Sequence, residues 1–172
     1  MNILKLELTH FGKFHLKTIT FTSGLNIVYG KNEAGKSTIH AFVRSMLFGI
    51  PDTEEGNERY SHYLPWETPH DFCGRMWIKK DDKVYRIERN FLRPQPTVRI
   101  FDDETDESLQ PAKQHLRQIL SGLTETSYLN TICIEQLKSA ADPQLAKELE
   151  DMAVNASQSK NLNIDVKQAK QE

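Results

Sequence analysis

Residues 30–38 of the chain read GKNEAGKST, which fits the pattern G-x-x-x-x-G-K-[ST] of a phosphate-binding loop (P-loop). Gly30 and Gly35 let the backbone curl so that its N–H groups face inward, at the N-terminus of a helix whose dipole adds positive charge. Lys36 can reach the β- and γ-phosphates of a nucleotide, and the Ser37 hydroxyl can ligate Mg²⁺. The candidate phosphate-binding residues are Gly30, Lys31, Asn32, Ala34, Gly35, Lys36, Ser37 and Thr38.

The neighbours of this loop supply the context that the motif requires. Residues 25–29 include the adjacent pair Ile27 and Val28, which predicts a central strand buried on both faces. After the loop, apolar residues recur at the spacing of one helix face, and Gly49 followed by Pro51 stops the helix. This face carries Ile39, Phe42, Val43, Met46 and Leu47. A glycine-rich turn with an incidental Lys-Ser pair is the alternative, but the strand–loop–helix context favours nucleotide binding.

Alternating polar and apolar residues predict antiparallel strands around this unit. Residues 4–8 and 18–21 alternate with period two, and each is expected to form a strand with one buried face. The alternation resumes over residues 76–91, interrupted once, which predicts a hairpin, and residues 97–101 are expected to add a further strand. The fold class expected is therefore α/β, a P-loop NTPase lobe with an antiparallel β-hairpin region.

The other segments are assigned by their turn and cap residues. Residues 51–70 are polar and rich in turn-forming residues, and we expect a long loop there. Pro111 opens and Gly122 closes a predicted helix. Thr124 can cap a short helix, and residues 132–134 are expected to form a brief strand.

Composition and charge limit the classes of protein to which the chain can belong. The chain has 172 residues, of which 38% are hydrophobic and 27% charged, with a mean hydropathy of −0.59. No apolar run approaches the ~20 residues that span a bilayer. Two cysteines are too few for a disulfide framework and fit a reducing compartment, so a cytoplasmic location is expected. The net charge falls from +4 over residues 1–50 to −6 over residues 101–172, which suits an anionic ligand near the N-terminus, although solvated surface charge explains the same numbers.

Several stretches resemble the N-terminal ATPase segment of the SMC-like DNA-repair ATPases (SbcC/RecF type), within which the bacterial YhaN-like AAA-family ATPases are the most similar. The matching stretches are FGKF at 11–14, ITF at 19–21, GLNIVYGKNEAGKST at 24–38, MLFGI at 46–50, YRIERNF at 85–91 and ICIEQ at 132–136. The resemblance implies an ABC-type head that binds ATP and Mg²⁺. It also implies that Gln136, the loop glutamine of that family, touches Mg²⁺ and the attacking water. Where the family often has an arginine after the first strand, this chain has Lys13, so a phosphate or base contact there would fall to Lys13.

The resemblance also implies a division of labour between parts of a longer protein. Residues 1–140 would be the P-loop lobe and residues 141–172 a helical segment that begins a coiled coil or packs on its own lobe. Hydrolysis in this family needs an acidic strand and a signature loop from a C-terminal lobe and a second head. Residues 98–104 and 120–122 imitate these elements, but we interpret them as a surface strand with an acidic turn and as a helix C-cap. The chain is therefore expected to be half of an ATPase, with DNA, a second head in an ATP-dependent homodimer and a nuclease subunit as implied partners.

Weaker patterns and rival functions remain open at this point. His62, His70 and Cys73 fit no zinc spacing. Residues 75–99 carry a net charge of +5 with interleaved aromatics, which suits a DNA-backbone surface or, more simply, the wet face of alternating strands. The rivals to the SMC-like ATPase are a self-contained P-loop kinase or phosphotransferase, which would turn over alone, and an interaction module that binds ATP without hydrolysis.

Overall fold

The computed structural model describes residues 1–133, and the contacts along the whole chain divide it into two units, Met1–Gly122 and Leu123–Glu172. Each unit is described here by itself. The predictions for Gln136 and for residues 141–172 lie outside the described residues.

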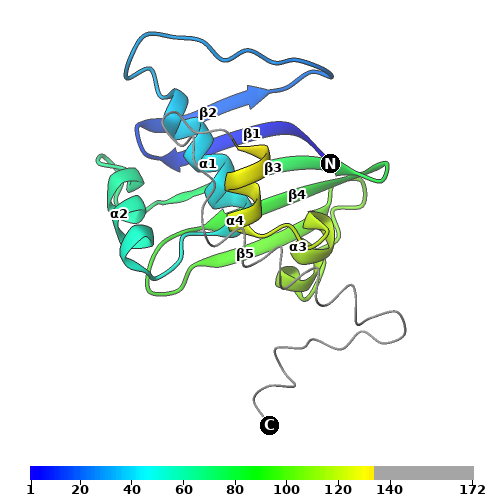
Figure 1. The fold of residues 1–172 in the computed structure, drawn as a ribbon. Helices are drawn as coiled ribbons and strands as arrows, with labels where there is room; N and C mark the ends of the chain where they lie inside the picture. Colours follow the sequence, from blue (N-terminus) through cyan, green and yellow to red (C-terminus); the bar gives the residue numbers. More distant parts are fainter. Residues whose placement is uncertain (134–172) are drawn as a thin grey trace. The chain divides into compact units, whose positions relative to one another are not determined.

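The first unit is built on a five-stranded antiparallel sheet with the order β2-β1-β3-β4-β5 (Figure 1). The strands are β1 (Asn2–Phe11), β2 (Phe14–Thr20), β3 (Cys73–Lys80), β4 (Lys83–Asn90) and β5 (Thr97–Asp102). The predicted hairpin is confirmed as β3–β4, and its two-residue turn places Asp81 and Asp82 at φ 49° and 62°, a conformation that aspartate tolerates. The strands expected near residues 4–8, 18–21 and 97–101 are confirmed as β1, β2 and β5.

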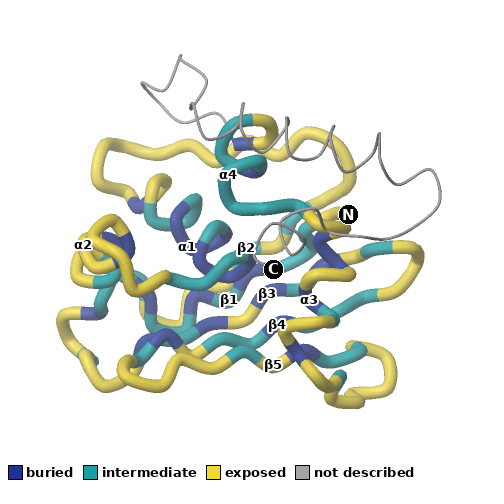
Figure 2. The backbone as a smooth tube through the Cα atoms, turned by 60° about the horizontal axis from the view of Figure 1, so that its bottom comes forward, coloured by how far each residue is buried: buried dark blue, intermediate teal, exposed yellow. Residues whose placement is uncertain are grey.

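One face of the sheet forms the core of this unit. Its strand residues are apolar and fully buried, because the period-two alternation places every second side chain on the same face (Figure 2). They are Leu6, Leu8, Met76, Ile78, Ile87 and Ile100. Helix α1 (Lys36–Phe48) covers this face and supplies the predicted apolar stripe. Phe42 of α1 lies so close to β3 that a Cβ at Gly74 would lie 2.5 Å from Phe42 Cζ.

The end of α1 follows the sequence prediction. Gly49 terminates the helix at φ 84°, a left-handed value that favours glycine, and its N–H donates to the Ser45 carbonyl at 2.8 Å. The position of α1 on the sheet is therefore defined at both ends, by the P-loop before it and by this glycine after it.

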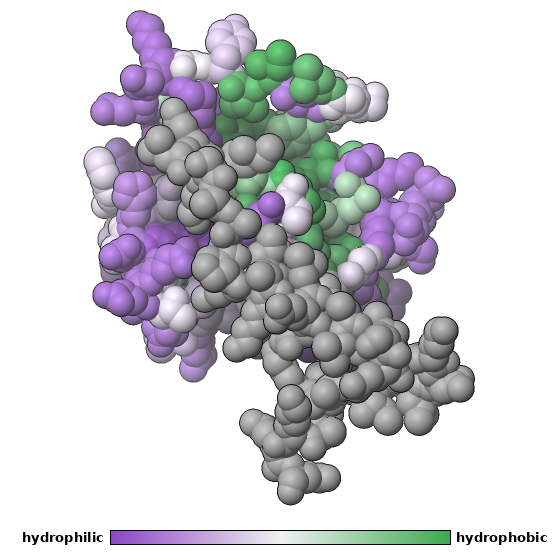
Figure 3. All heavy atoms as spheres, viewed as in Figure 1, coloured by the Kyte–Doolittle hydropathy of each residue, from purple (hydrophilic) through white to green (hydrophobic). Residues whose placement is uncertain are grey.

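The expected strand at Leu25–Tyr29 is wrong for this structure. The residues between β2 and α1 form no ladder with any described strand, and Leu25, Ile27 and Tyr29 are 87%, 74% and 90% exposed. Apolar surface gathers at the upper edge of Figure 3, where Figure 1 draws this segment. The sequence has the composition of a buried central strand, but no strand among the described residues lies beside it to bury it.

The long loop expected over residues 51–70 is also wrong, because it contains helix α2 (Glu54–Tyr63). Thr53 caps this helix by accepting a hydrogen bond from the Gly56 N–H at 3.2 Å. The helix is polar and has no apolar stripe, so periodicity could not reveal it. It packs through aromatic rings, since Tyr60 meets Phe72 edge-on at 5.3 Å between ring centroids.

The two segments that imitate catalytic elements are what the sequence analysis expected. Strand β5 lies at the edge of the sheet, so residues 98–104 are not a central buried strand. Helix α3 (Ala112–Leu120) confirms the predicted helix, and Ser121 and Gly122 follow it with left-handed φ values of 53° and 76°. Their N–H groups donate to the Gln118 and Arg117 carbonyls, which is a helix C-cap and not a signature loop.

The described part of the second unit contains two short helical turns. Helix α4 (Glu125–Ser127) begins at Thr124, whose hydroxyl accepts from the Ser127 N–H at 3.0 Å, as predicted. A π-helical turn, η1 (Tyr128–Ile132), follows. The brief strand expected over residues 132–134 is wrong at its first residue, because Ile132 closes this helical turn and its backbone cannot also be extended. No helix among residues 1–133 is long and apolar enough to cross a membrane.

Candidate nucleotide-binding site

The P-loop backbone has the curled geometry that the glycines predict. Glu33 and Gly35 have positive φ values of 63° and 99°, and α1 begins immediately afterwards at Lys36. The Ile39 N–H donates to the Gly35 carbonyl at 3.0 Å, whereas within residues 1–133 the N–H groups of residues 36–38 have no carbonyl partner. Such free N–H groups at the positive end of a helix form an anion-binding concavity.

The side chain of Lys36 folds back over this concavity. Its ammonium donates to the carbonyls of Gly30 at 2.7 Å and Lys31 at 2.9 Å. Ser37 is exposed beside it, at the first turn of the helix. The loop is closed by the Ala34 N–H, which donates to the Lys31 carbonyl at 3.2 Å. These groups supply the N–H donors, cation and hydroxyl that a phosphate with Mg²⁺ requires.

The turn between β1 and β2 contacts the P-loop through two side chains. Lys13 donates from its ammonium to the Glu33 carbonyl, and the ring of Phe14 packs on Gly35. The packing is close enough that a Cβ at position 35 would lie 2.8 Å from Phe14 Cε2. The structure therefore brings Lys13 to the P-loop, while the expected contact of Lys13 with a phosphate or base stays a prediction. Gly35 meets two requirements, a left-handed backbone and a close aromatic neighbour.

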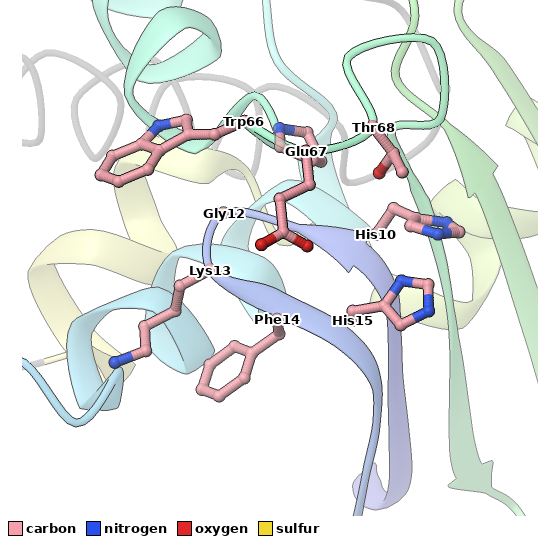
Figure 4. A pocket seen from close by; sticks show the side chains of 9 residues that line it. His10, Gly12, Lys13, Phe14, His15, Trp66, Glu67 and Thr68 are labelled. Atoms are coloured by element: carbon pink, nitrogen blue, oxygen red, sulfur yellow. The ribbon is translucent and has the colours of Figure 1, made fainter.

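A cavity of about 170 Å³ opens at the same turn (Figure 4). The β1–β2 turn and the segment after α2 line it, through His10, Gly12, Lys13, Phe14, His15, Pro65, Trp66, Glu67 and Thr68. The two segments are joined by the Gly12 N–H, which donates to the Tyr63 carbonyl at 2.7 Å. In Figure 4 the Glu67 carboxylate points toward the turn, while His10 and His15 lie side by side with ring centroids 4.6 Å apart.

Sequence reasoning missed the part of this cavity that follows α2. Trp66 is 91% exposed and lines the cavity, so its ring is accessible to a ligand there. A tryptophan placed between Pro65 and Pro69 in an otherwise polar stretch was a usable signal. The place of Trp66 in the cavity could not be predicted from the sequence, because it depends on helix α2, which the sequence patterns did not predict.

The histidines and the cysteine considered as metal ligands lie in different elements. His62 belongs to helix α2 and Cys73 begins β3, and among residues 1–133 no group of three or more potential ligands is arranged to hold an ion. Cys73 is half-buried on β3, and burial, with a smaller contribution from Asp71, raises the pKa of its thiol above the ordinary value of 9.0. It is therefore a protonated thiol at neutral pH.

The basic stretch on β3, β4 and β5 is largely neutralised by ion pairs on the other face of the sheet. Glu88 lies at the centre, with Arg75 Nε and Arg86 Nε each 3.2 Å from its Oε1 and Arg99 Nη2 3.0 Å from its Oε2. Arg86 also reaches Asp106 at 2.5 Å. This pairing supports the simpler of the two interpretations, the wet face of alternating strands.

The loop of residues 30–38, the helix that follows it and the supporting turn have the arrangement typical of a P-loop. A model of the AAA domain family matches residues 1–158, and the chain belongs to this family. Two curated proteins are similar to it. The "Uncharacterized protein YhaN" of Bacillus subtilis (strain 168) is 43% identical over 56 residues, which cover 32% of this chain and 6% of that protein. The "DNA double-strand break repair Rad50 ATPase" of Thermococcus kodakarensis is 26% identical over 146 residues, which cover 79% of this chain and 15% of that protein.

These similarities confirm the resemblance to SMC-like, SbcC-type ATPases and give the chain an ATPase family. The chain spans only a small fraction of the length of either relative.

Proposed function

We propose that this chain binds ATP with Mg²⁺ through the P-loop, as the N-terminal lobe of an SMC-like ATPase that acts in DNA repair or DNA metabolism. The observation that carries the proposal is the anion-binding concavity at the start of α1, where free N–H groups of residues 36–38 and the Lys36 ammonium converge. On phosphate binding, Lys36 exchanges its carbonyl partners for β- and γ-phosphate oxygens. Ser37 would ligate the Mg²⁺, with Gln136 as a further ligand implied by the resemblance.

Substitution of Lys36 tests this proposal. The Lys36→Ala variant should lose measurable ATP binding while its thermal unfolding stays close to wild type, because the side chain is exposed and bonds only loop carbonyls. Lys17→Ala is the control, since Lys17 is an exposed lysine of β2 that does not belong to the candidate site, and it should leave the ATP affinity at the wild-type value. Titration with a fluorescent ATP analogue measures both, and unchanged affinity in a folded Lys36→Ala protein would refute the site.

The cavity beside the P-loop is the place that we assign to the nucleoside. Lys13 and Phe14 line this cavity and also contact the P-loop, so a molecule held by its phosphates at α1 has the cavity within reach. Trp66 offers an exposed aromatic face for stacking on a base. Trp66→Ala should weaken ATP binding but leave the affinity for inorganic triphosphate unchanged. Equal effects on both ligands, or none on ATP, would remove the cavity from the binding site.

Hydrolysis is proposed to require a C-terminal lobe and a second head. The support is the exposed apolar segment 25–29 directly before the P-loop, whose backbone lacks a ladder partner among the described strands. A strand from another lobe that pairs with it would fix the position of Gly30 and of the P-loop that follows. Binding groups alone, without groups that favour the transition state, give no acceleration.

The test is complementation. Residues 1–172 alone should bind ATP and release negligible phosphate, and mixing with the C-terminal lobe of the same protein should produce turnover that depends on Lys36. Gln136→Ala in the full-length protein should lower turnover much more than affinity. Turnover by the chain alone, abolished by Lys36→Ala, would instead favour a self-contained P-loop enzyme.

DNA is proposed as a partner of the whole protein, supported by the similarity to a DNA double-strand break repair ATPase, and a nuclease subunit is proposed on the family resemblance alone. An ATP-dependent homodimer of heads is proposed on the same resemblance. Stimulation of the complete protein's ATP hydrolysis by double-stranded DNA, and its dimerisation with ATP in sedimentation, are the measurements. If neither is observed, the favoured alternative is an interaction module that binds ATP without hydrolysis.

A further inference from the structure

Arg89 of β4 reaches across the core and binds the far end of the P-loop helix. Its Nε donates to the Met46 carbonyl at 2.7 Å, and its Nη2 donates to the Leu47 carbonyl at 3.2 Å. Both carbonyls belong to the last turn of α1, where backbone acceptors have no partner within the helix. One guanidinium therefore satisfies two of the open carbonyls with a single rigid fork.

The Arg89 guanidinium has no acidic partner among residues 1–133, where no carboxylate forms an ion pair with it. Desolvation by burial lowers its pKa from the ordinary value for arginine to about 10. The negative end of the α1 dipole is thus the group that compensates this partly buried cation. The other arginines of the neighbouring strands differ, since Arg75, Arg86 and Arg99 pair with carboxylates on the opposite face of the sheet.

Gly49 lets the Arg89 guanidinium lie close to the end of α1. It ends α1 at φ 84°, and a Cβ at this position would lie 3.3 Å from Arg89 Nη1. A second arginine, Arg59 of α2, donates to the Gly49 carbonyl at 3.4 Å. The segment that leaves α1 is therefore held from the sheet by Arg89 and from α2 by Arg59.

We propose that Arg89 is a positioning residue for the P-loop, because its two bonds to the C-terminal turn of α1 set where the helix N-terminus lies. The proposal rests on the proposed function in one respect, namely that the ligand at that N-terminus is ATP. Helix α1 has 13 residues, so its two ends lie about 20 Å apart. That distance exceeds the screening length of about 8 Å at physiological salt, so the direct charge effect on a phosphate is small. The coupling is mechanical, through a rigid helix.

Substitutions on β4 test the proposal with a matched control on the same strand. Arg89→Met removes both bonds and keeps an apolar stem, while Arg89→Lys keeps the charge but cannot reproduce the fork. Arg86→Met is the control, because Arg86 lies three residues earlier, faces away from α1 and also loses several polar contacts. The assays use the 172-residue chain at a temperature where each variant is folded by circular dichroism. They record the backbone amide NMR signals of residues 35–38 and the affinity for MgATP.

The expected result is a displaced set of P-loop amide signals in Arg89→Met, with about fivefold or greater loss of MgATP affinity. Arg89→Lys should lie between it and wild type, and Arg86→Met should leave both readouts at wild-type values. A purely structural role of Arg89 would lower the melting temperature without moving signals some 20 Å away. Arg89→Met with unmoved P-loop amides overturns the proposal, and so does an affinity equal to that of Arg86→Met.

Two further outcomes have defined meanings. If Arg89→Met does not fold, Arg89→Lys decides, and its equality with Arg86→Met in both readouts overturns the proposal. If wild type binds no MgATP, the proposed function fails, while the P-loop amide comparison still decides whether Arg89 positions the loop.

Discussion

The contact between Phe14 and Gly35 allows a sharp test of how the β1–β2 turn supports the P-loop. In Gly35→Ala the new residue must adopt φ 99°, which costs about 1–3 kcal/mol for a residue with a Cβ. The Cβ would also lie 2.8 Å from Phe14 Cε2, and relieving such an overlap costs about another 1–3 kcal/mol. We therefore expect Gly35→Ala to lower the free energy of unfolding by about 2–6 kcal/mol.

A double-mutant cycle separates these two costs. In a Phe14→Ala background the ring is gone, so Gly35→Ala should cost only the backbone strain of about 1–3 kcal/mol. The difference between the two backgrounds is the coupling energy, measured by urea unfolding followed by circular dichroism. The same cost of Gly35→Ala in both backgrounds would refute the claim that Phe14 packs on the P-loop. A cost below about 0.5 kcal/mol in wild type would refute the strain argument as well.

Three other predictions concern the exposed segment, helix α2 and the buried thiol. Ile27→Ser should change the unfolding free energy of residues 1–172 by less than about 0.5 kcal/mol, because the side chain is 74% exposed. Ile87→Ala in the core should lower it by about 2–5 kcal/mol, and denaturant unfolding measures both variants. Gly56→Ala should destabilise α2, since the added Cβ would lie 2.9 Å from the Pro51 carbonyl carbon, and a fall in melting temperature measures this; an unchanged value contradicts the close approach. Because the pKa of Cys73 is raised, less thiolate is present at each pH, and the alkylation rate of the folded chain should reach half its maximum above pH 9.0. If the pH at half-maximal rate is at or below that of the urea-unfolded chain, the burial of the thiol is contradicted.

Sequence patterns predicted the parts of the fold in which local chemistry and tertiary environment agree. The alternation over β1, β3 and β4 predicts which side chains face the core, because one face of each strand packs on the core and the other faces solvent. The helix after the P-loop was predicted from its apolar stripe, and its end from Gly49. The P-loop residues were predicted because the motif constrains the backbone directly, through Gly35 and the start of α1.

The failures have a different physical origin. Helix α2 is stabilised by its Thr53 cap and by ring contacts such as Tyr60 on Phe72, and neither produces a hydrophobic period. The contribution of Phe14 and Trp66 to the site depends on which segments the fold brings together. The role of Arg89 was equally hidden, because an arginine inside an alternating strand normally indicates the wet face, and this one points into the core toward open helix carbonyls.

The segment before the P-loop requires a different explanation. Its sequence has the apolar composition of a central strand, yet Leu25 and Ile27 are exposed in the structure. Composition reflects the environment in which a segment is stable, and a buried strand needs neighbours on both edges to satisfy its backbone groups. On the proposed function those neighbours belong to the C-terminal lobe, so the mismatch between pattern and exposure is itself a reason to expect a partner sheet. The P-loop is then fixed from two directions, with Gly30 tied to the completed sheet and Gly35 tied to Phe14 of the β1–β2 turn. Completing the sheet would therefore act on the phosphate-binding loop directly, without any change at Lys36 or Ser37.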